Sequence, residues 1–399
     1  MFLLIVFGIL GIIYGYSGWR IILPLRLSLS ENFVAWIALV VLLVLPIHVL
    51  RLRSSAAGHW WYELLTWIAF LELGFAILTF SLLVIRDLGW FGASGLDRIL
   101  SWSGRPASSS LLPTAPERRL FLLNALNLSV VGLSASLAGY GLHAARHRLR
   151  IFEVSIPIRG LPPSLEGFRI AQISDTHIGL TIKGDFLEKV VEKVEGLAPD
   201  LIALTGDLID GEVEHLRHHV SSLQRLSAPC GCFFVTGNHE YYNNNPAAWI
   251  AEIERLGFTV LLNEHRLVEK SGARFLIAGV TDHSAGRTDL HAASDPQAAL
   301  TDAPPGLFRL LLAHQPLSIF AAAKAGFDLQ LSGHTHGGQF IPWKYVIPLQ
   351  QPFVAGLHRF ENTWIYVNRG TGYWGPPLRL GAPAEISLIT LTRDREPTT

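Results

Sequence analysis

The sequence has few cysteines and few charged residues, and each shortage excludes a class of protein. Cys230 and Cys232 are the only cysteines among 399 residues, too few for a disulfide framework or a four-cysteine zinc site. We interpret them as small apolar side chains at the start of a buried strand. Charged residues make up only 16% of the chain and hydrophobic residues 50%. This composition is too apolar for a purely soluble protein.

Lysine is absent from the first 150 residues, and charge is divided unevenly along the chain. Residues 1–150 carry 12 arginines and 6 acidic residues, whereas residues 151–399 carry 20 basic and 26 acidic residues. The second part, which carries most of the Asp and His residues, is therefore acidic overall. A nucleic-acid-binding surface would instead show a basic stripe, so we expect no nucleic-acid partner.

Long apolar runs predict four membrane-spanning helices, because a span needs about 20 predominantly apolar residues. The first run lacks a basic start and a small-residue cleavage site, so we interpret it as a helix and not as a signal peptide. Residues 88–117 are rich in Ser, Gly and Pro and predict an exposed loop. The predicted spans cover residues 2–25, 33–50, 64–85 and 120–145.

The arginines near these spans predict an orientation. If residues 151–399 lie outside, seven arginines lie inside and five outside, which favours this topology slightly. The segment 117–122 resembles a twin-arginine export signal, and an ordinary positive-inside flank explains it equally well. The inner set is Arg20, Arg26, Arg86, Arg98, Arg105, Arg118 and Arg119, and the outer set is Arg51, Arg53, Arg146, Arg148 and Arg150.

One carboxyl group, that of Glu72, falls in the middle of the third predicted span. An intramembrane carboxylate is by default a functional hypothesis. We favour a carboxyl that is protonated or faces another helix. Ionisable residues do not recur at a regular spacing in the other spans, so a transport pathway is not supported.

From residue 151 onward, short apolar runs alternate with helical periodicity, which predicts an α/β architecture with buried sheets. Helices are predicted over residues 186–197 and 247–256. The predicted strands cover residues 168–173, 201–204, 233–235, 274–280, 308–312, 329–331, 364–367 and 386–391.

Polar residues cluster where five of these strands end. In open α/β sheets, ligands bind beyond the carboxyl ends of strands, so we expect these loops to converge. Each residue alone has an ordinary explanation, such as a turn, a cap or a satisfied core histidine. Together they form a nitrogen and oxygen donor set without thiolate, which suits Mn, Fe or Zn. The donors are Asp175, His177, Asp207, Asn238, His314, His334 and His336. His239, next to Asn238, is not counted as a ligand.

The order of these blocks, Asp-x-His, Gly-Asp, Gly-Asn-His-Glu, His and Gly-His-x-His, resembles the calcineurin-like metallophosphoesterase superfamily. The segments 333–339, 367–370, 377–379 and 385–386 look like its membrane-associated bacterial branch. The resemblance covers residues 151–399 and implies a four-layer α/β/β/α sandwich, preceded here by the transmembrane region 1–150. Glu240 stands where many relatives have Asp.

The resemblance also implies a site with two divalent metal ions, Mn, Fe or Zn, and a metal-bridging hydroxide that attacks a phosphate ester or pyrophosphate bond. His239 would protonate the leaving oxygen, or only orient a ligand. Arg369 and Arg379 would hold a substrate phosphate, with structural ion pairs as the alternative. In the implied ligand set the first ion takes Asp175, His177 and His336, the second takes Asn238, His314 and His334, and Asp207 bridges them.

The leading hypothesis is therefore a membrane-anchored phosphoesterase, and a lipid-linked substrate is suggested by apolar residues 343–347 just after the last metal block. The alternative is a catalytically silent membrane sensor or scaffold that keeps the fold. The complete ligand set argues for the enzyme. We expect an integral protein of a bacterial inner membrane, with its catalytic domain on the extracytoplasmic side.

Overall fold

A computed structural model describes residues 2–52, 56, 59–102, 110–242, 245–287 and 293–394. The chain divides into two compact units, Met1–Gly141 and Leu142–Thr399. The boundary precedes residue 150, because Ala145 packs into the core of the second unit and Arg146 Nη1 donates to the Thr181 carbonyl. Arg53 and Arg105, which entered the orientation argument, lie outside the described residues.

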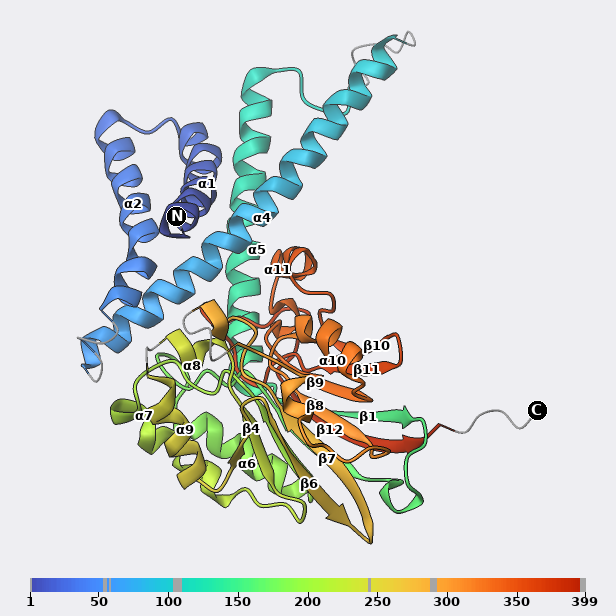
Figure 1. Ribbon diagram of the computed structural model, residues 1–399. Coiled ribbons are helices and arrows are strands. Elements are labelled where there is room, and N and C mark those ends of the chain that lie inside the picture. The colour runs from blue at the N-terminus through green and yellow to red at the C-terminus, as the bar shows by residue number, and fades with distance from the viewer. Residues whose placement is uncertain are drawn as a thin grey trace. The chain divides into compact units, whose positions relative to one another are not determined.

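The first unit consists of long apolar helices (Figure 1). The described residues contain four helices that are long and apolar enough to cross a membrane. Large apolar side chains such as Phe33 and Leu128 are exposed on them, as expected for helices surrounded by lipid. The helices are α1 (Phe2–Ile22), α2 (Leu29–Arg51), α4 (Trp60–Trp102) and α5 (Pro116–His147), of which α5 continues into the second unit.

The prediction of a loop from residue 88 is wrong for its first part, since α4 continues to Trp102. Three glycines in this stretch weaken a helix by about 1 kcal/mol each. Leu88, Trp90, Phe91 and Ile99 favour the helix, and the first proline after residue 60 is Pro106. The remaining apolar residues therefore outweigh the glycines.

Close contacts hold the first unit together. A Cβ atom added at Gly18 would meet Trp36 and Leu39 of α2, so the absence of a side chain lets α1 approach α2. Tyr14 Oη donates to Glu72 Oε2 at 2.6 Å. The Glu72 carboxyl in the middle of the third predicted span thus faces another helix, α1, which is one of the two alternatives expected from the sequence.

The second unit contains two six-stranded sheets. The first sheet has the order β1-β12-β2-β3-β4-β5, and β2 to β5 are parallel. Its strands are β1 (Arg150–Ile158), β2 (Arg169–Ile173), β3 (Leu201–Thr205), β4 (Cys232–Val235), β5 (Thr259–Val260) and β12 (Glu385–Arg393).

The second sheet has the order β10-β11-β9-β8-β7-β6, in which β7, β8, β9 and β11 are parallel. Its strands are β6 (Glu264–Lys270), β7 (Ala273–Gly279), β8 (Arg309–Leu312), β9 (Leu329–Ser332), β10 (Gly356–Phe360) and β11 (Thr363–Val367). The helices of the unit are α6 (Gly184–Leu197), α7 (Val213–Val220), α8 (Asn238–Tyr242), α9 (Pro246–Arg255), α10 (Ile319–Ala325) and α11 (Trp343–Val346).

The side chains of each strand alternate between two apolar cores, following the two-residue period of a strand. Leu201 and Ala203 of β3 pack between the two sheets, while Ile202 and Leu204 pack under α6, α7 and α9. Ala322 of α10 packs on the outer face of the second sheet (Figure 1). These layers confirm the predicted α/β/β/α sandwich.

Candidate metal centre

The predicted ligands lie on loops that follow parallel strands of both sheets. In the first sheet, Asp175 and His177 follow β2, Asp207 follows β3, and Asn238 follows β4 at the start of α8. In the second sheet, His314 follows β8, and His334 and His336 follow β9. The carboxyl ends of the parallel strands therefore bring donors from five chain segments to one place.

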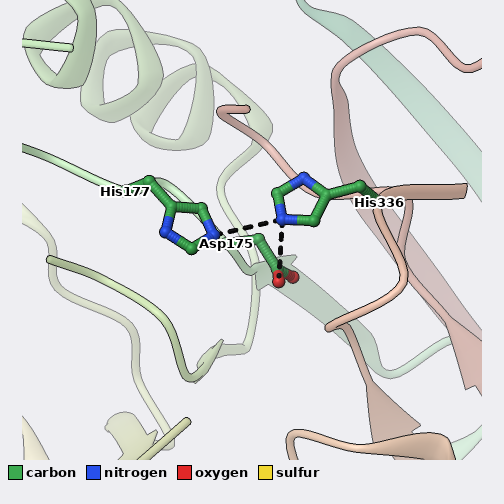
Figure 2. Close-up of side chains that lie close together, drawn as sticks. All are labelled: Asp175, His177 and His336. Atoms are coloured by element: carbon green, nitrogen blue, oxygen red, sulfur yellow. Dashed lines mark hydrogen bonds and ion pairs between the residues drawn. The ribbon is translucent and has the colours of Figure 1, made fainter. Parts of the chain in front are cut away.

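A first cluster consists of Asp175, His177 and His336, which Figure 2 shows pointing toward one another. His177 Nε2 lies 3.1 Å from His336 Nε2, and His336 Nε2 lies 3.5 Å from Asp175 Oδ1. One donor atom from each of the three residues lies within 4.8 Å of the others. This spacing is compatible with three ligands of one ion.

A second cluster consists of Asp207, His314 and His334. His314 Nε2 lies 3.1 Å from Asp207 Oδ2 and 3.2 Å from His334 Nδ1. Asn238 Oδ1 also lies 3.2 Å from His314 Nε2 and adds a neutral oxygen donor.

Asp207 lies within reach of both clusters. Its Oδ2 atom is 3.1 Å from His314 Nε2 in the second cluster and 3.8 Å from His177 Nε2 in the first. The structure thus brings all seven predicted ligands together, with Asp207 in a central position.

The backbone of the site is strained. Five of the seven residues adopt left-handed φ values between 49° and 70°, at a cost of roughly 1–2 kcal/mol per residue. Strain of this kind persists only where the surrounding structure holds it, and it concentrates at functional sites. The five residues are Asp175, His177, Asp207, His334 and His336.

Two glycines of the motifs allow the loops to approach one another. A Cβ atom at Gly333 would collide with the Ser174 hydroxyl and the Asp175 carboxylate, and one at Gly237 would collide with the Asp207 carboxylate. Each glycine therefore lets the backbone of one loop contact a ligand on another.

The Glu240 carboxylate ties two of these loops together. It accepts hydrogen bonds from the backbone N–H groups of Asp207 at 3.1 Å, Leu208 at 2.9 Å and Gly237 at 2.6 Å. Burial and the Asp207 charge raise the pKa of Glu240 to about 7. Glu240 thus acts on the backbone around Asp207, a role that sequence reasoning did not identify.

Asp210 is the functional candidate that sequence reasoning missed. Its Oδ1 atom lies 2.5 Å from His239 Nδ1 and 3.3 Å from His177 Nδ1. It also forms a donor cluster with these two histidines. The signal was its position three residues after Asp207 in Gly-Asp-Leu-Ile-Asp, which places it on the same loop after β3.

The charges around His239 favour its protonated form. Burial lowers the pKa of this imidazole, but the Asp207 and Asp210 carboxylates raise it to about 9. Its Nε2 atom lies 3.9 Å from Asp207 Oδ2, so the ring borders the second cluster. A protonated imidazole here is suited to donate a proton.

The donor set fits a divalent metal. Burial lowers the pKa of His334 to about 3 and that of His336 well below its usual value, so both rings are neutral and offer a lone pair. Despite burial, the Asp207 charge raises the pKa of His314, and the His314 charge lowers that of Asp207. Imidazole and carboxylate donors together suit Mn, Fe or Zn.

The structure places both predicted phosphate-binding arginines in contacts with the protein itself. Arg369 Nη1 donates to Glu385 Oε2 at 2.6 Å. The fully buried Arg379 donates from Nε to the Gly372 carbonyl at 3.1 Å and from Nη1 to the His336 carbonyl at 3.0 Å. These contacts favour the structural alternative for both residues. Arg369 is already paired with Glu385 of β12, and Arg379 already bonds the loop after β9 and the chain after β11.

Comparison with known proteins agrees with this site. The family model for calcineurin-like phosphoesterases matches residues 168–338. A "Transmembrane protein with metallophosphoesterase domain" of Bos taurus is 37% identical over 313 residues, covering 75% of this chain and 69% of the relative. The protein of the same name from Danio rerio is 34% identical over 342 residues, covering 84% and 74%.

A bacterial relative, the "Uncharacterized metallophosphoesterase YkuE" of Bacillus subtilis, is 31% identical over 283 residues, covering 69% of this chain and 97% of the relative. The matched family segment contains all the residues of both clusters and Asp210. The chain therefore belongs to the calcineurin-like phosphoesterase family.

Proposed function

We propose that this protein is a membrane-anchored phosphoesterase that uses two divalent metal ions to hydrolyse a phosphate ester or pyrophosphate bond. The observation that carries the proposal is the convergence of seven nitrogen and oxygen donors in two adjoining clusters around Asp207. Four apolar helices and relatives named as transmembrane proteins support the membrane anchor.

We assign Asp175, His177 and His336 to one ion and Asn238, His314 and His334 to the other, with Asp207 as the shared ligand. When bound, such a pair of ions supplies a water-derived nucleophile near neutral pH and offsets charge on a phosphoryl oxygen. Asn238 adds no charge, so the site would keep a net positive charge that attracts a phosphate when two divalent ions are bound.

His239 is the proposed proton donor to the leaving oxygen. Asp210 contacts its Nδ1 atom at 2.5 Å, which leaves Nε2 directed away from Asp210. We therefore assign Asp210 as a positioning residue that orients the His239 ring and favours its protonated form. Proton transfer from such a group contributes roughly 10²–10⁴-fold in rate.

We further propose a lipid-linked substrate, because an apolar rim lies next to the candidate ligands. Helix α11 packs directly on the loop after β9, where a Cβ atom at Gly338 would meet the Lys344 backbone. The Trp374 ring lies 5.7 Å from the His239 ring. The rim consists of Ile341, Trp343, Tyr345, Leu349 and Trp374, all exposed, with Tyr345 at 70% and Leu349 at 82%.

Hydrolysis of a generic aryl phosphate tests the enzyme assignment. We expect the full-length protein to hydrolyse it and the Asp207→Ala variant to lose nearly all turnover. Full turnover in Asp207→Ala, or a correctly folded, metal-loaded protein without hydrolase activity, would favour the silent sensor or scaffold instead.

The lipid assignment is tested with a lipid-linked pyrophosphate and a soluble ester, each assayed with and without detergent. We expect Trp343→Ser/Tyr345→Ser to lose turnover of the lipid substrate and keep turnover of the soluble ester. Leu267→Ser on the edge strand β6 is the matched control, since it also removes an exposed apolar side chain. Equal turnover of both substrates by the unmodified protein would contradict the lipid assignment.

We also propose that the protein lies in a bacterial inner membrane with its catalytic unit on the extracytoplasmic side. The uneven distribution of arginines supports this topology. A C-terminal reporter that is active only outside the cytoplasm should be active in this fusion. Activity of a reporter that works only in the cytoplasm would contradict the proposal.

A further inference from the structure

A small cavity lies within the first unit, between the end of α1, α4 and α5. Its volume is about 110 Å³, several times the roughly 10–15 Å³ that a cavity needs on this measure to hold one water molecule. It therefore has room for a small polar group. The cavity is lined by Trp19, Arg20, Leu23, Pro24, Arg86, Leu123 and Asn127.

Two of the lining residues carry positive charge and share one carboxylate. Arg20 Nη2 donates to Asp87 Oδ1 at 2.5 Å, and Arg86 Nη2 donates to the same oxygen at 2.6 Å. Two guanidinium groups against one carboxylate leave a surplus of one positive charge. The Arg86 side chain is only 7% exposed, so this charge is shielded from solvent.

Hydrogen bonds reach Asp87 and all three guanidinium nitrogens of Arg86, but they leave Arg20 incomplete. Arg86 Nε also donates to the Asp87 carboxylate, at 2.9 Å, and Tyr16 Oη donates a fourth hydrogen bond to it. Asn127 Oδ1 accepts from Arg86, and Asn127 Nδ2 donates to the Arg20 carbonyl at 2.9 Å. Arg20 Nε is buried and has no hydrogen-bond partner among the described residues. The Arg20 guanidinium group therefore has a free N–H that an anion in the cavity could accept from.

The rest of the lining is apolar and lies next to the lipid-facing surface. Trp19 is 51% exposed and Leu23 is 54% exposed, and Arg20 lies in the last turn of α1. A residue at the end of a spanning helix lies at the level of the lipid headgroups. Basic pockets between transmembrane helices bind anionic headgroups at this level.

From the cavity, the surplus charge and the apolar surroundings, we propose that the first unit binds the phosphate group of one anionic phospholipid between Arg20 and Arg86. Planar guanidinium groups match the oxygens of a phosphate. The acyl chains of the lipid would lie along the exposed sides of Trp19 and Leu23. This proposal is independent of the phosphoesterase activity, since it concerns residues of the helical unit alone.

The test is native mass spectrometry of the full-length protein in detergent, titrated with phosphatidylglycerol or phosphatidylcholine. We expect one tightly retained phosphatidylglycerol per chain and at least about tenfold weaker retention of phosphatidylcholine. Arg20→Gln should weaken phosphatidylglycerol retention by about tenfold. Arg26→Gln is the matched control, because this exposed arginine lies near the same end of α1 outside the cavity, and it should change retention less than twofold.

A second variant keeps the test valid if Arg20→Gln disturbs folding. Leu123→Phe fills the cavity from its apolar side and leaves Arg20, Arg86 and Asp87 in place. It should also lose specific retention, while both variants keep the helical circular dichroism of the unmodified protein.

Equal retention by the unmodified protein and Leu123→Phe would overturn the proposal, as would equal retention of the two lipids. Inorganic phosphate forms the third arm of the experiment. If phosphate alone protected the protein against thermal unfolding through Arg20 while phosphatidylglycerol did not, the ligand would be a soluble anion and the lipid assignment would be wrong.

Discussion

Among single residues, Asp210 shows how the proposed chemistry depends on side chains outside the proposed ligand set. Its carboxylate contacts both His239 Nδ1 and His177 Nδ1. It therefore fixes the ring of the proposed proton donor and that of a proposed ligand at the same time. Second-layer contacts of this kind typically contribute 10–100-fold to metal affinity or activity.

We predict that Asp210→Asn lowers kcat for phenyl phosphate by about 10²-fold, with a much smaller change in KM. The loss should be several times smaller for 4-nitrophenyl phosphate, because its leaving oxygen needs less protonation. Steady-state kinetics on the two esters checks this prediction, and metal content should be measured in the same samples.

Asp302→Asn is the control for Asp210→Asn, since it changes an exposed aspartate in a turn of the same unit. It should leave both reactions unchanged. An equal loss on both esters in Asp210→Asn would show that Asp210 does not act through the leaving group.

Sequence reasoning found the seven proposed ligands but not Asp210 or the role of Glu240. The ligands come in motifs, and each lies directly after an apolar strand. Asp210 acts through His239, and Glu240 acts through the backbone N–H groups of Asp207 on a neighbouring loop and of Gly237 on its own loop. Asp210 and His239 are 29 positions apart in the sequence, and Asp207 and Glu240 are 33 positions apart. Only the fold reveals these two contacts.

At the scale of elements, the contacts between loops explain why the motifs contain glycine. The turn after β9 passes so close to Asp175 that no side chain fits at Gly333. The second sheet therefore delivers His334 to the first sheet's ligands only because this position has no Cβ atom. The backbone N–H of His334 also donates to the Asp175 carboxylate at 3.0 Å.

We predict that Gly333→Ala reduces metal content and activity by more than tenfold and lowers the melting temperature. The added methyl group would displace Asp175 or the β9 loop, and overpacking of this kind costs roughly 1–3 kcal/mol. Metal analysis, kinetics and thermal unfolding of the full-length protein measure the three effects.

Gly196→Ala in α6 is the matched control. A Cβ atom at Gly196 meets nothing within 4 Å in the described part of the chain, and alanine favours a helix over glycine by about 1 kcal/mol. The control should therefore be as active as the unmodified protein and at least as stable. Normal metal binding in Gly333→Ala would contradict the close approach of the two loops.

The predicted strands were those with apolar runs, and the missed ones lie mainly at sheet edges. The structure adds β1, β5, β6 and β10, of which β1, β6 and β10 have many exposed or half-buried residues. An edge strand buries one face or less, so polar residues such as those in Glu-His-Arg-Leu-Val-Glu-Lys interrupt its apolar pattern. Strand β5 has only two residues and gives no periodic signal.

For the whole molecule, the site places strain and buried charge at the centre of the second unit. Asp175 and Asp207 are buried together with four histidines, and Asp210 beside them is half-buried. Several of these residues have left-handed backbones. The four buried histidines are His177, His239, His314 and His336. Cations bound by these carboxylates would offset their mutual repulsion. Binding to the folded state would therefore raise the stability of the entire unit.

We predict that chelation lowers the melting temperature of the full-length protein by several degrees. Ligand at 100 times its Kd stabilises the folded state by about 2.7 kcal/mol, and that contribution is lost when the ions are removed. Thermal unfolding before and after treatment with a chelator measures the shift, and added Mn or Zn should reverse it.

Asp207→Ala provides the comparison for chelation, since it lacks the proposed shared ligand. Its melting temperature should respond much less to the chelator. A large shift in the melting temperature of this variant would mean that the stabilising ions bind elsewhere. No shift in the unmodified protein would mean that no stabilising ion is bound.

The most direct test of the central claim is the number of metal ions bound per chain, measured by elemental analysis of the purified full-length protein together with its rate of ester hydrolysis. The account predicts two divalent ions per chain and activity that returns when Mn, Fe or Zn is added to the metal-free protein. In Asp207→Ala, it predicts that fewer than two ions are bound per chain. Full hydrolytic activity with one ion or none, or two fully occupied ions in Asp207→Ala, would contradict it.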